Sequence, residues 1–453
     1  MGIILSIVVT VVVGYLIMKK YKPQTVLIIG GMILMFAGAW LGYGKILASP
    51  KQATGLMLFD AYEFIKQTLS SRAAGLGLNI MMVGGFAKYM DHIGASRALV
   101  KMTIRPLLKL KSPYIVLSGC WVLGMFLGLA INSASGLAML LMVTMFPVLV
   151  SLGVSRVAAT AAIATTLCLD WSPSDTGTIL SATTAGIDPV IYWTTYQVPI
   201  AMITIPVVAV LHYFTQKYMD KKDGHVAAPI EIEKVEEADK TPLYYAILPI
   251  VPLCLILSFS DLWIKTIKMD IIKAMMIGVT VGMAFEFFRN RDMKKTFTDI
   301  QVFFDGLGTQ MANVITLIVA GEVFARGLVV TGTIDAVIHG AETSGLGAAG
   351  MTFVMIAIIA VCSVVMGSGN APFFAFAALT PTVATKMSIA PVVMLLPMHF
   401  AASAARAISP ITAVIVVAAG IANISPFDLV KRTVVPMVGA LLCIIIGNFV
   451  LFF

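Results

Sequence analysis

Long apolar runs, separated by short polar stretches, make up most of this chain. Runs close to the roughly 20 residues that cross the hydrocarbon layer of a bilayer lie at about 3–18, 25–43, 75–91, 157–185, 190–214, 243–260, 271–288, 308–330, 391–423 and 427–453. Two of them, 157–185 and 391–423, are interrupted by proline and polar residues. The pattern predicts an all-α membrane protein with about 10 transmembrane helices, two of them broken.

Two further apolar stretches, 113–152 and 347–388, are divided near the middle by small polar residues. The dividing sequences are Asn132-Ser133-Ala134-Ser135-Gly136 and Gly367-Ser368-Gly369-Asn370-Ala371-Pro372. Irregular backbone at membrane depth is tolerated only where protein or a water-filled cavity covers it. We therefore interpret both stretches as re-entrant hairpins whose tips stop within the membrane.

Three proline pairs indicate an internal duplication. Ser172-Pro173, Asp188-Pro189 and Val198-Pro199 recur 237 positions later as Ser409-Pro410, Ser425-Pro426 and Val435-Pro436. Proline inside an apolar helix removes a backbone donor and clashes with the preceding turn, so three prolines in register indicate that both copies break a helix at the same point. We predict a first repeat at 1–215 and a second repeat at 243–453. The polar, mixed-charge segment 216–242 would link them.

The positions of the basic residues predict the orientation of the chain. Lysine and arginine cluster in 19–22, 97–111, 217–240, 289–295 and 431–432, which all fall on one side of the predicted topology. Cytoplasmic loops carry the excess of positive charge in membrane proteins. The linker would then be cytoplasmic, the two repeats would cross the membrane in opposite directions, and both termini would be periplasmic.

Composition narrows the class of protein further. With 59% hydrophobic and 12% charged residues, the chain cannot form a soluble fold with a polar surface. The net charge is +8, but most basic residues lie in short segments between apolar runs, where they indicate the orientation of the chain. No nucleic-acid partner is therefore expected. The sequence contains no His-Glu-x-x-His zinc motif, no Gly-x-Ser-x-Gly elbow and no complete phosphate-binding loop. We expect neither an enzyme nor a bound cofactor or metal.

Polar residues at membrane depth gather at four places, which are the two hairpin tips and the two helix breaks. A helix N-terminus carries about half a positive charge and unpaired amide groups, so such breaks can hold carboxylates. Interrupted segments in corresponding positions of two repeats are typical of a secondary transporter's binding site. A single serine or threonine could equally pack between helices, but the matched set favours binding. The candidate contacts are Asn132, Ser133, Ser135, Ser172, Ser174, Thr176, Ser368, Gly369, Asn370, Ser409 and Thr412.

Arg406 precedes the second break and follows a run of small residues that cannot shield it. Burying an unpaired arginine at the bilayer centre costs about 2.5–3.5 kcal/mol even on the lenient scale. It should therefore pair with Asp170 or Asp175, or bind a substrate carboxylate with both arms of the guanidinium. The two aspartates could balance charge, which we favour, carry a coupling proton or bind a cation. His399 is either a structural residue or a proton relay.

Four long segments of this sequence resemble the anaerobic C4-dicarboxylate carrier (DcuC) family, within the superfamily of inverted-repeat elevator carriers. They are "GSGNAPFFAF" (367–376), "ISPFDLVKRTVVP" (424–436), "SASGLAMLLMVTMFPVLVSLGVSR" (133–156) and "MMVGGFAKYMDHIGA" (81–95). The resemblance implies a bacterial inner-membrane carrier of succinate, fumarate or malate, working by exchange or proton-linked efflux. It also implies a transport domain that moves against a scaffold, usually in a homodimer.

The resemblance extends to some of the candidate site residues. Arg406, Ser409 and Pro410 fall where the family has its second helix break, whereas the first break, "LDWSPSDTG" (169–177), is more acidic and bulkier. Asn132 and Asn370 are similar to sodium sites of related carriers, although the tips lack the Ser-Asn-Thr order of that group. The coupling ion, proton or sodium, stays open. The alternatives are a carrier of the same architecture for a zwitterion such as aspartate, and a channel.

Overall fold

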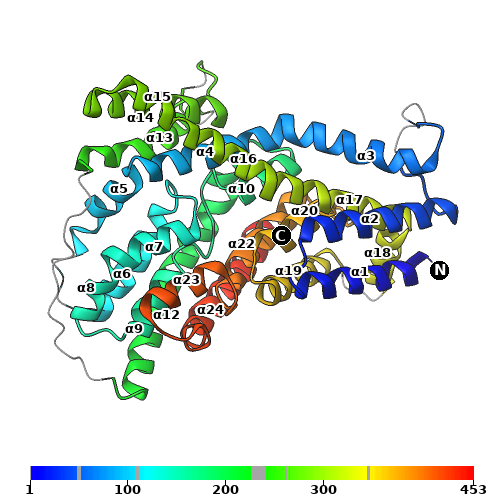
Figure 1. The fold of residues 1–453 in the computed structure, drawn as a ribbon. Helices are drawn as coiled ribbons and strands as arrows, with labels where there is room; N and C mark the ends of the chain where they lie inside the picture. Colours follow the sequence, from blue (N-terminus) through cyan, green and yellow to red (C-terminus); the bar gives the residue numbers. More distant parts are fainter. Residues whose placement is uncertain are drawn as a thin grey trace.

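The fold is built from helices, as the pattern of apolar runs predicts. The computed structural model describes residues 2–47, 53–107, 110, 112–225, 241–260, 263–264, 266–343 and 347–453. Within these ranges every regular element is helical and there is no strand (Figure 1). The predicted all-α class is therefore confirmed.

The N-terminal half of the chain contains twelve of these α-helices. Their bounds are α1 (Gly2–Met18), α2 (Pro23–Trp40), α3 (Met57–Arg72), α4 (Leu78–His92), α5 (Ala95–Ile104), α6 (Pro113–Leu127), α7 (Ala134–Thr144), α8 (Phe146–Ser151), α9 (Arg156–Ala164), α10 (Thr176–Ala185), α11 (Pro189–Tyr192) and α12 (Val198–Lys222). A π-helical turn, Trp193–Gln197, joins α11 to α12.

The C-terminal half begins with a 3-10 helix, Leu243–Ile250, that leads into α13. The α-helices are α13 (Val251–Ser258), α14 (Ile271–Asn290), α15 (Met293–Asp299), α16 (Gln301–Gln310), α17 (Thr316–Val330), α18 (Thr333–Thr343), α19 (Gly347–Met366), α20 (Asn370–Ala377), α21 (Thr380–Lys386), α22 (Pro391–Arg406), α23 (Ala413–Ala422) and α24 (Pro426–Phe452).

Some helices of the two halves have bounds at the spacing that the repeated prolines predict. Helices α10 and α23 begin and end 237 positions apart, and α4 and α17 begin and end 238 positions apart. A π-helical turn precedes each of α4 and α17, at Ala73–Gly77 and Met311–Ile315. The repeated prolines have different local roles, because Pro189 and Pro426 begin helices, where a missing amide proton costs little. Another repeated pair, Pro173 and Pro410, lies between helices.

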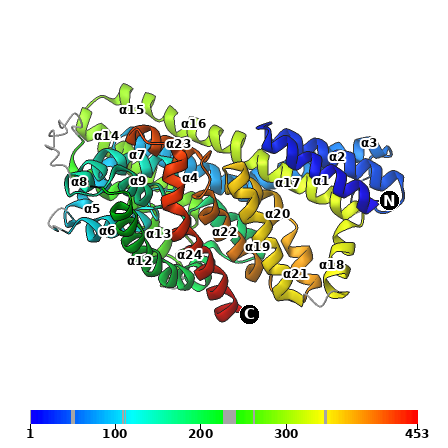
Figure 2. The same cartoon turned by 90° about the horizontal axis from the view of Figure 1, so that it is seen from below.

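Two long helical segments connect the ends of the molecule. The π-helical turns continue α3 into α4 and α16 into α17, so that 57–92 and 293–330 each run without a break. Figures 1 and 2 show these segments passing from the end formed by α5 to α9 toward the end formed by α1, α2 and α18. Helices α4 and α16 pack side by side along the way.

Six helical segments of the described chain are long and apolar enough to cross a membrane. They are Pro23–Trp40, Pro189–Lys222, Ile271–Asn290, Met293–Val330, Gly347–Met366 and Pro426–Phe452. The predicted number of about 10 is not confirmed, because α1 has only 17 residues and the interrupted stretches form shorter helices. Helix α12 continues to Lys222, within the predicted linker, and 226–240 lie outside the described residues.

Helix α22 forms the centre of the core. Every side chain from Val392 to Ala405 is buried, and the alanines before Arg406 let neighbouring backbones approach closely. Helices α10, α19, α20 and α24 all pack against it. This position carries the C-terminal end of α22 into the middle of the protein (Figure 1), where the second helix break follows.

Candidate functional site

The segments predicted to be hairpin tips and helix breaks converge on one cavity of about 350 Å³. The tips lie between α6 and α7 and between α19 and α20, and the breaks lie between α9 and α10 and between α22 and α23. Most of the residues that the sequence predicts for the site line this cavity. They are Asn132, Ser135, Asp170, Asp175, Thr176, Ser368, Gly369, Asn370, Arg406 and Thr412.

Ser172 and Ser174 lie behind the cavity wall and hold the first tip to the first break. The Ser172 hydroxyl donates to the Leu129 carbonyl at 3.0 Å and lies 3.0 Å from the Ser174 hydroxyl. The Asn132 side-chain amide donates to the Ser174 hydroxyl at 2.9 Å. These bonds orient Asn132 at the cavity surface, so the two serines act on the site through the tip.

Arg406 forms an ion pair with Asp170, which decides between the two acids that the sequence left open. Guanidinium Nη2 lies 2.8 Å from each carboxylate oxygen of Asp170 and donates to the Leu167 carbonyl at 2.9 Å. The Ser403 hydroxyl also donates to Asp170, at 2.8 Å. Among the described residues, no acceptor faces Arg406 Nη1 or Nε. Arg406 therefore pairs with Asp170 through one nitrogen, and its other two guanidinium nitrogens can donate to a ligand in the cavity that the side chain lines.

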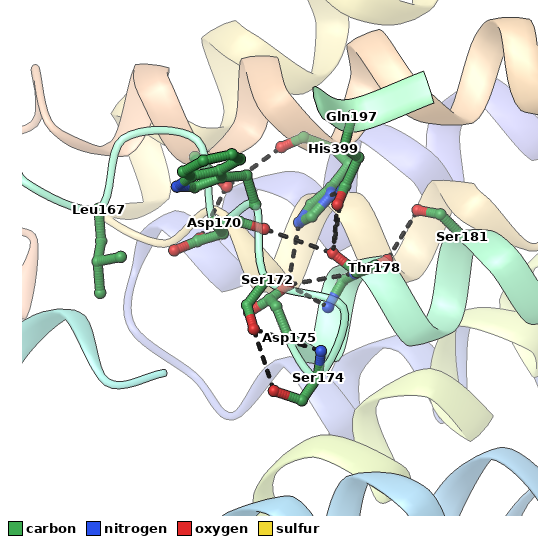
Figure 3. A network of polar contacts seen from close by, with 12 residues as sticks. Leu167, Asp170, Ser172, Ser174, Asp175, Thr178, Ser181, Gln197 and His399 are labelled. Atoms are coloured by element: carbon green, nitrogen blue, oxygen red, sulfur yellow. Dashed lines mark hydrogen bonds and ion pairs between the residues drawn. The ribbon is translucent and has the colours of Figure 1, made fainter. Parts of the chain in front are cut away.

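Asp175 caps α10 and contacts a histidine from α22. Its Oδ2 accepts from the amides of Gly177 and Thr178 at 2.8 and 3.1 Å, and His399 Nε2 lies 3.3 Å from the same oxygen. Figure 3 shows Asp175, His399, Gln197 and Thr178 forming one connected polar network. Gly177 is required here, because a Cβ at that position would lie 2.1 Å from His399 Nε2. His399 itself does not line the cavity.

The two helices that start at the breaks differ at their N-termini. The Asp175 carboxylate accepts from the first amides of α10, whereas no side chain of the described residues caps α23. The hydroxyl of Thr412, the residue before α23, donates instead to the Arg406 carbonyl at 2.6 Å. Ala413 and Val414, the first residues of α23, line the cavity. The α23 terminus can therefore offer backbone donors and a partial positive charge to an anion.

The sequence analysis missed a third wall, which comes from α16 and the π-helical turn after it. Thr309, Gln310, Asn313 and Val314 line the cavity, although 308–330 was interpreted only as a membrane span. The three polar residues lie within one helical turn of an otherwise apolar run, and that spacing was the available signal.

Two other serines predicted for the site, Ser133 and Ser409, do not line this cavity. Ser133 lines a neighbouring cavity of about 230 Å³, which shares Asn132, Thr176, Thr309 and Gln310 with the first. The Ser409 side chain is fully buried, and its hydroxyl has no hydrogen-bond partner in the part of the chain that the structure describes. Ser409 therefore does not reach the cavity surface.

Comparison with known proteins places these features in a family. The family model described as C4-dicarboxylate anaerobic carrier (DcuC) matches residues 1–453. The chain belongs to the DcuC family. It is 36% identical over 450 residues to the probable anaerobic C4-dicarboxylate transporter DcuC of Vibrio cholerae, covering 99% of this chain and 97% of that protein. Identity to the anaerobic C4-dicarboxylate transporter DcuC of Escherichia coli K12 is 36% over 447 residues, covering 98% and 96%.

Solved structures of other transporters share the fold. The YdaH transporter of Alcanivorax borkumensis superposes with a TM-score of 0.63 at 15% identity, covering 95% of this chain and 98% of that one. MtrF of Neisseria gonorrhoeae superposes with a TM-score of 0.58 at 15% identity, covering 94% of each chain. Membership of the DcuC family confirms that the chain is a multi-pass membrane carrier and not an enzyme.

Proposed function

We propose that this chain is a secondary active transporter of C4-dicarboxylates such as succinate, fumarate and malate. The observation that carries the proposal is Arg406, which lines the cavity and, among the described residues, bonds through Nη2 alone, to Asp170 and the Leu167 carbonyl. A guanidinium with free donors is suited to bind a carboxylate through two parallel hydrogen bonds. The names of the DcuC relatives point to the same substrate class.

A dicarboxylate needs a second anchor, which the helix termini can supply. The uncapped start of α23 lies beside Arg406 in the cavity wall, and the starts of α7 and α20 contribute Ser135 and Asn370. These groups are neutral donors, so they can hold a second carboxylate without adding further full charges to a buried site. We propose that one carboxylate binds Arg406 and that the other binds the donors at the hairpin tips.

We further propose that the site moves as one body between the two sides of the membrane. The tips and breaks would form the transport unit, and the continuous segments 57–92 and 293–330 would be arms of the scaffold. This motion would be of the elevator type. The chain would consist of two inverted repeats with both termini periplasmic, and it would form a homodimer in the bacterial inner membrane. The bonds from Ser174 to Asn132 and from Asp170 to Arg406 support the rigid unit, since they join a tip and two breaks.

Radiolabelled succinate flux into proteoliposomes tests the proposed function. Succinate inside the vesicles should accelerate uptake, because a carrier that exchanges substrates returns faster when loaded. Fumarate and malate should compete with succinate. Failure of every C4-dicarboxylate to be transported, together with transport of another class of solute, would overturn the proposal, and flux that never saturates with succinate would indicate a channel.

Two variants of the proposal have their own observations. Asp175 lines the cavity and could receive the amine of a zwitterion, so aspartate should be compared with succinate as a competitor. Asn132 Oδ1 is buried without a hydrogen-bond partner among the described residues, which makes it a candidate oxygen ligand for sodium. Imposing sodium and proton gradients separately on the vesicles distinguishes the two coupling ions.

A further inference from the structure

We propose that His399, held between Asp175 and Gln197, is the proton-binding site of this carrier and that its protonation is coupled to substrate binding. The inference rests on the proposed transport function and names the ion and the residue that would carry it. His399 contacts Asp175, which lines the cavity, but it does not line the cavity itself. His399 can therefore respond to the charge of a bound substrate through Asp175, without contacting the substrate itself.

The surroundings of His399 fix the ring and shield it from water. Its side chain is 4% exposed and that of Asp175 is 14% exposed. The ring stacks on Phe373 at 5.1 Å between centroids and packs against Phe400. The Asp175 carboxylate that contacts the ring is itself held in place, because the amides of Gly177 and Thr178 donate to its Oδ2. In our proposal the proton resides on the imidazole, and Asp175 lies between the imidazole and the cavity.

Gln197 can accommodate either protonation state of the ring. Its Nε2 lies 3.4 Å from His399 Nδ1, and both of its polar atoms lie near the Thr178 hydroxyl, Nε2 at 2.9 Å and Oε1 at 3.1 Å. When Nε2 faces the ring, Nδ1 accepts and His399 is neutral. When the amide rotates, Oε1 accepts from Nδ1–H, and the threonine hydroxyl can donate or accept in both arrangements. No buried partner is left unpaired in either state.

The charges around the cavity explain why such a site is useful. Arg406 pairs with Asp170, whereas Asp175 has no lysine or arginine partner among the described residues, so a carboxylate there adds negative charge beside the site of a dianion. A protonated His399 would cancel that charge. Binding of a proton and of a dicarboxylate therefore favour each other, and by linkage each raises the affinity for the other. The proton comes from water on the side to which the cavity is open and returns to water on the other side.

Among the described residues, the helices that pack against α22 bring no other unpaired charged group to the ring. Helices α10, α19 and α20, which pack against α22, contain no charged residue within their bounds. Charged side chains of the other two neighbours are paired, Lys386 of α21 with Asp335, and Lys431 and Arg432 of α24 with acids outside α22. Asp170, Asp175 and Arg406 are therefore the charges that His399 faces.

Proton movement during succinate flux tests the inference. Purified protein is reconstituted into vesicles that contain a pH-sensitive dye, and proton and radiolabelled succinate fluxes are measured together. We expect proton movement with succinate in the unmodified protein. His399→Gln should lower the proton-to-succinate ratio at least tenfold and flatten the pH dependence of succinate transport. His212→Gln is the matched control, because His212 is equally buried but bonds to Thr165 and contacts no carboxylate; it should retain the ratio.

A second variant keeps the test decisive if His399→Gln does not fold. Gln197→Leu removes a hydrogen bond to Nδ1 from both states of the ring, and the bond with the charged ring is the stronger of the two, so the midpoint of the pH dependence should move about one unit to lower pH. A ratio unchanged by His399→Gln, or a midpoint unmoved by Gln197→Leu, would overturn the inference. Succinate transport without proton movement in the unmodified protein would also overturn it, while leaving the proposed carrier function intact. Absence of any dicarboxylate transport would instead contradict that function.

Discussion

Replacing Arg406 with alanine tests the centre of the proposed site. The guanidinium side chain is 13% exposed, and the paired Asp170 side chain is 10% exposed, so the substitution removes a substrate anchor and also leaves a buried acid unpaired. Loss of a charge-assisted contact to a carboxylate should cost about 2–3 kcal/mol of binding, which corresponds to a roughly 30- to 150-fold weaker affinity for succinate. Leaving Asp170 without a partner should cost a further roughly 3–5 kcal/mol of stability.

The two effects can be measured separately. Binding is measured as the concentration dependence of succinate uptake in proteoliposomes, and stability is measured as the midpoint of thermal unfolding in detergent. The double variant Asp170→Asn, Arg406→Ala removes both charges, so it should recover most of the lost stability. It should not recover transport, because no cation remains in the cavity wall to bind the carboxylate.

The double variant also provides the refuting result. If it transports succinate with an affinity near that of the unmodified protein, Arg406 serves only to neutralise Asp170, and the assignment of a substrate contact is wrong. Arg406→Lys is the matched control. It preserves the positive charge near Asp170 but loses the planar fork of donors, so it should be more stable than Arg406→Ala while transporting succinate poorly.

Two further predictions concern packing and a second ion pair. Gly177→Ala should abolish transport and destabilise the protein, because the new Cβ would lie 2.1 Å from His399 Nε2. The Cβ of Gly420→Ala would meet nothing within 4 Å, so that variant should be neutral or stabilising by about 0.5–1 kcal/mol. Succinate transport and the midpoint of thermal unfolding of both variants test this pair. Arg432→Ala should destabilise the protein by roughly 3–5 kcal/mol, because Arg432 is 4% exposed and binds Asp220 at 2.7 Å. An unchanged unfolding midpoint for Arg432→Ala would contradict that reasoning.

Local sequence features were enough to locate most of the cavity lining. Small polar residues at 132–136 and 367–372 identified the segments that become the tips, and the prolines at 173 and 410 identified the breaks. Both signals are local, since they reflect the cost of exposing polar backbone in lipid and the cost of proline in a helix. The same signals failed for Gln310 and Asn313, because nothing interrupts the helix there and only its packing turns their side chains toward the cavity.

Partners that lie far apart in the sequence could not be derived in the same way. Asp170 and Asp175 have similar surroundings in sequence, yet one binds Arg406 and the other binds His399. Left-handed backbone at Asp170, with φ of 50°, and the capping of α10 by Asp175 give the two carboxylates different environments. The candidate list also could not separate Ser409, which is hidden in the core, from Thr412, which reaches the cavity.

The sequence by itself determined the helical class and the four polar segments of this carrier, because hydropathy and proline act through the nearest turns of the chain. Only the tertiary structure decided that α23 keeps its N-terminus uncapped while a carboxylate caps α10, and that α16 completes the cavity. These outcomes depend on tertiary packing, in which α22 from the C-terminal half contacts residues of the N-terminal half more than 200 positions away.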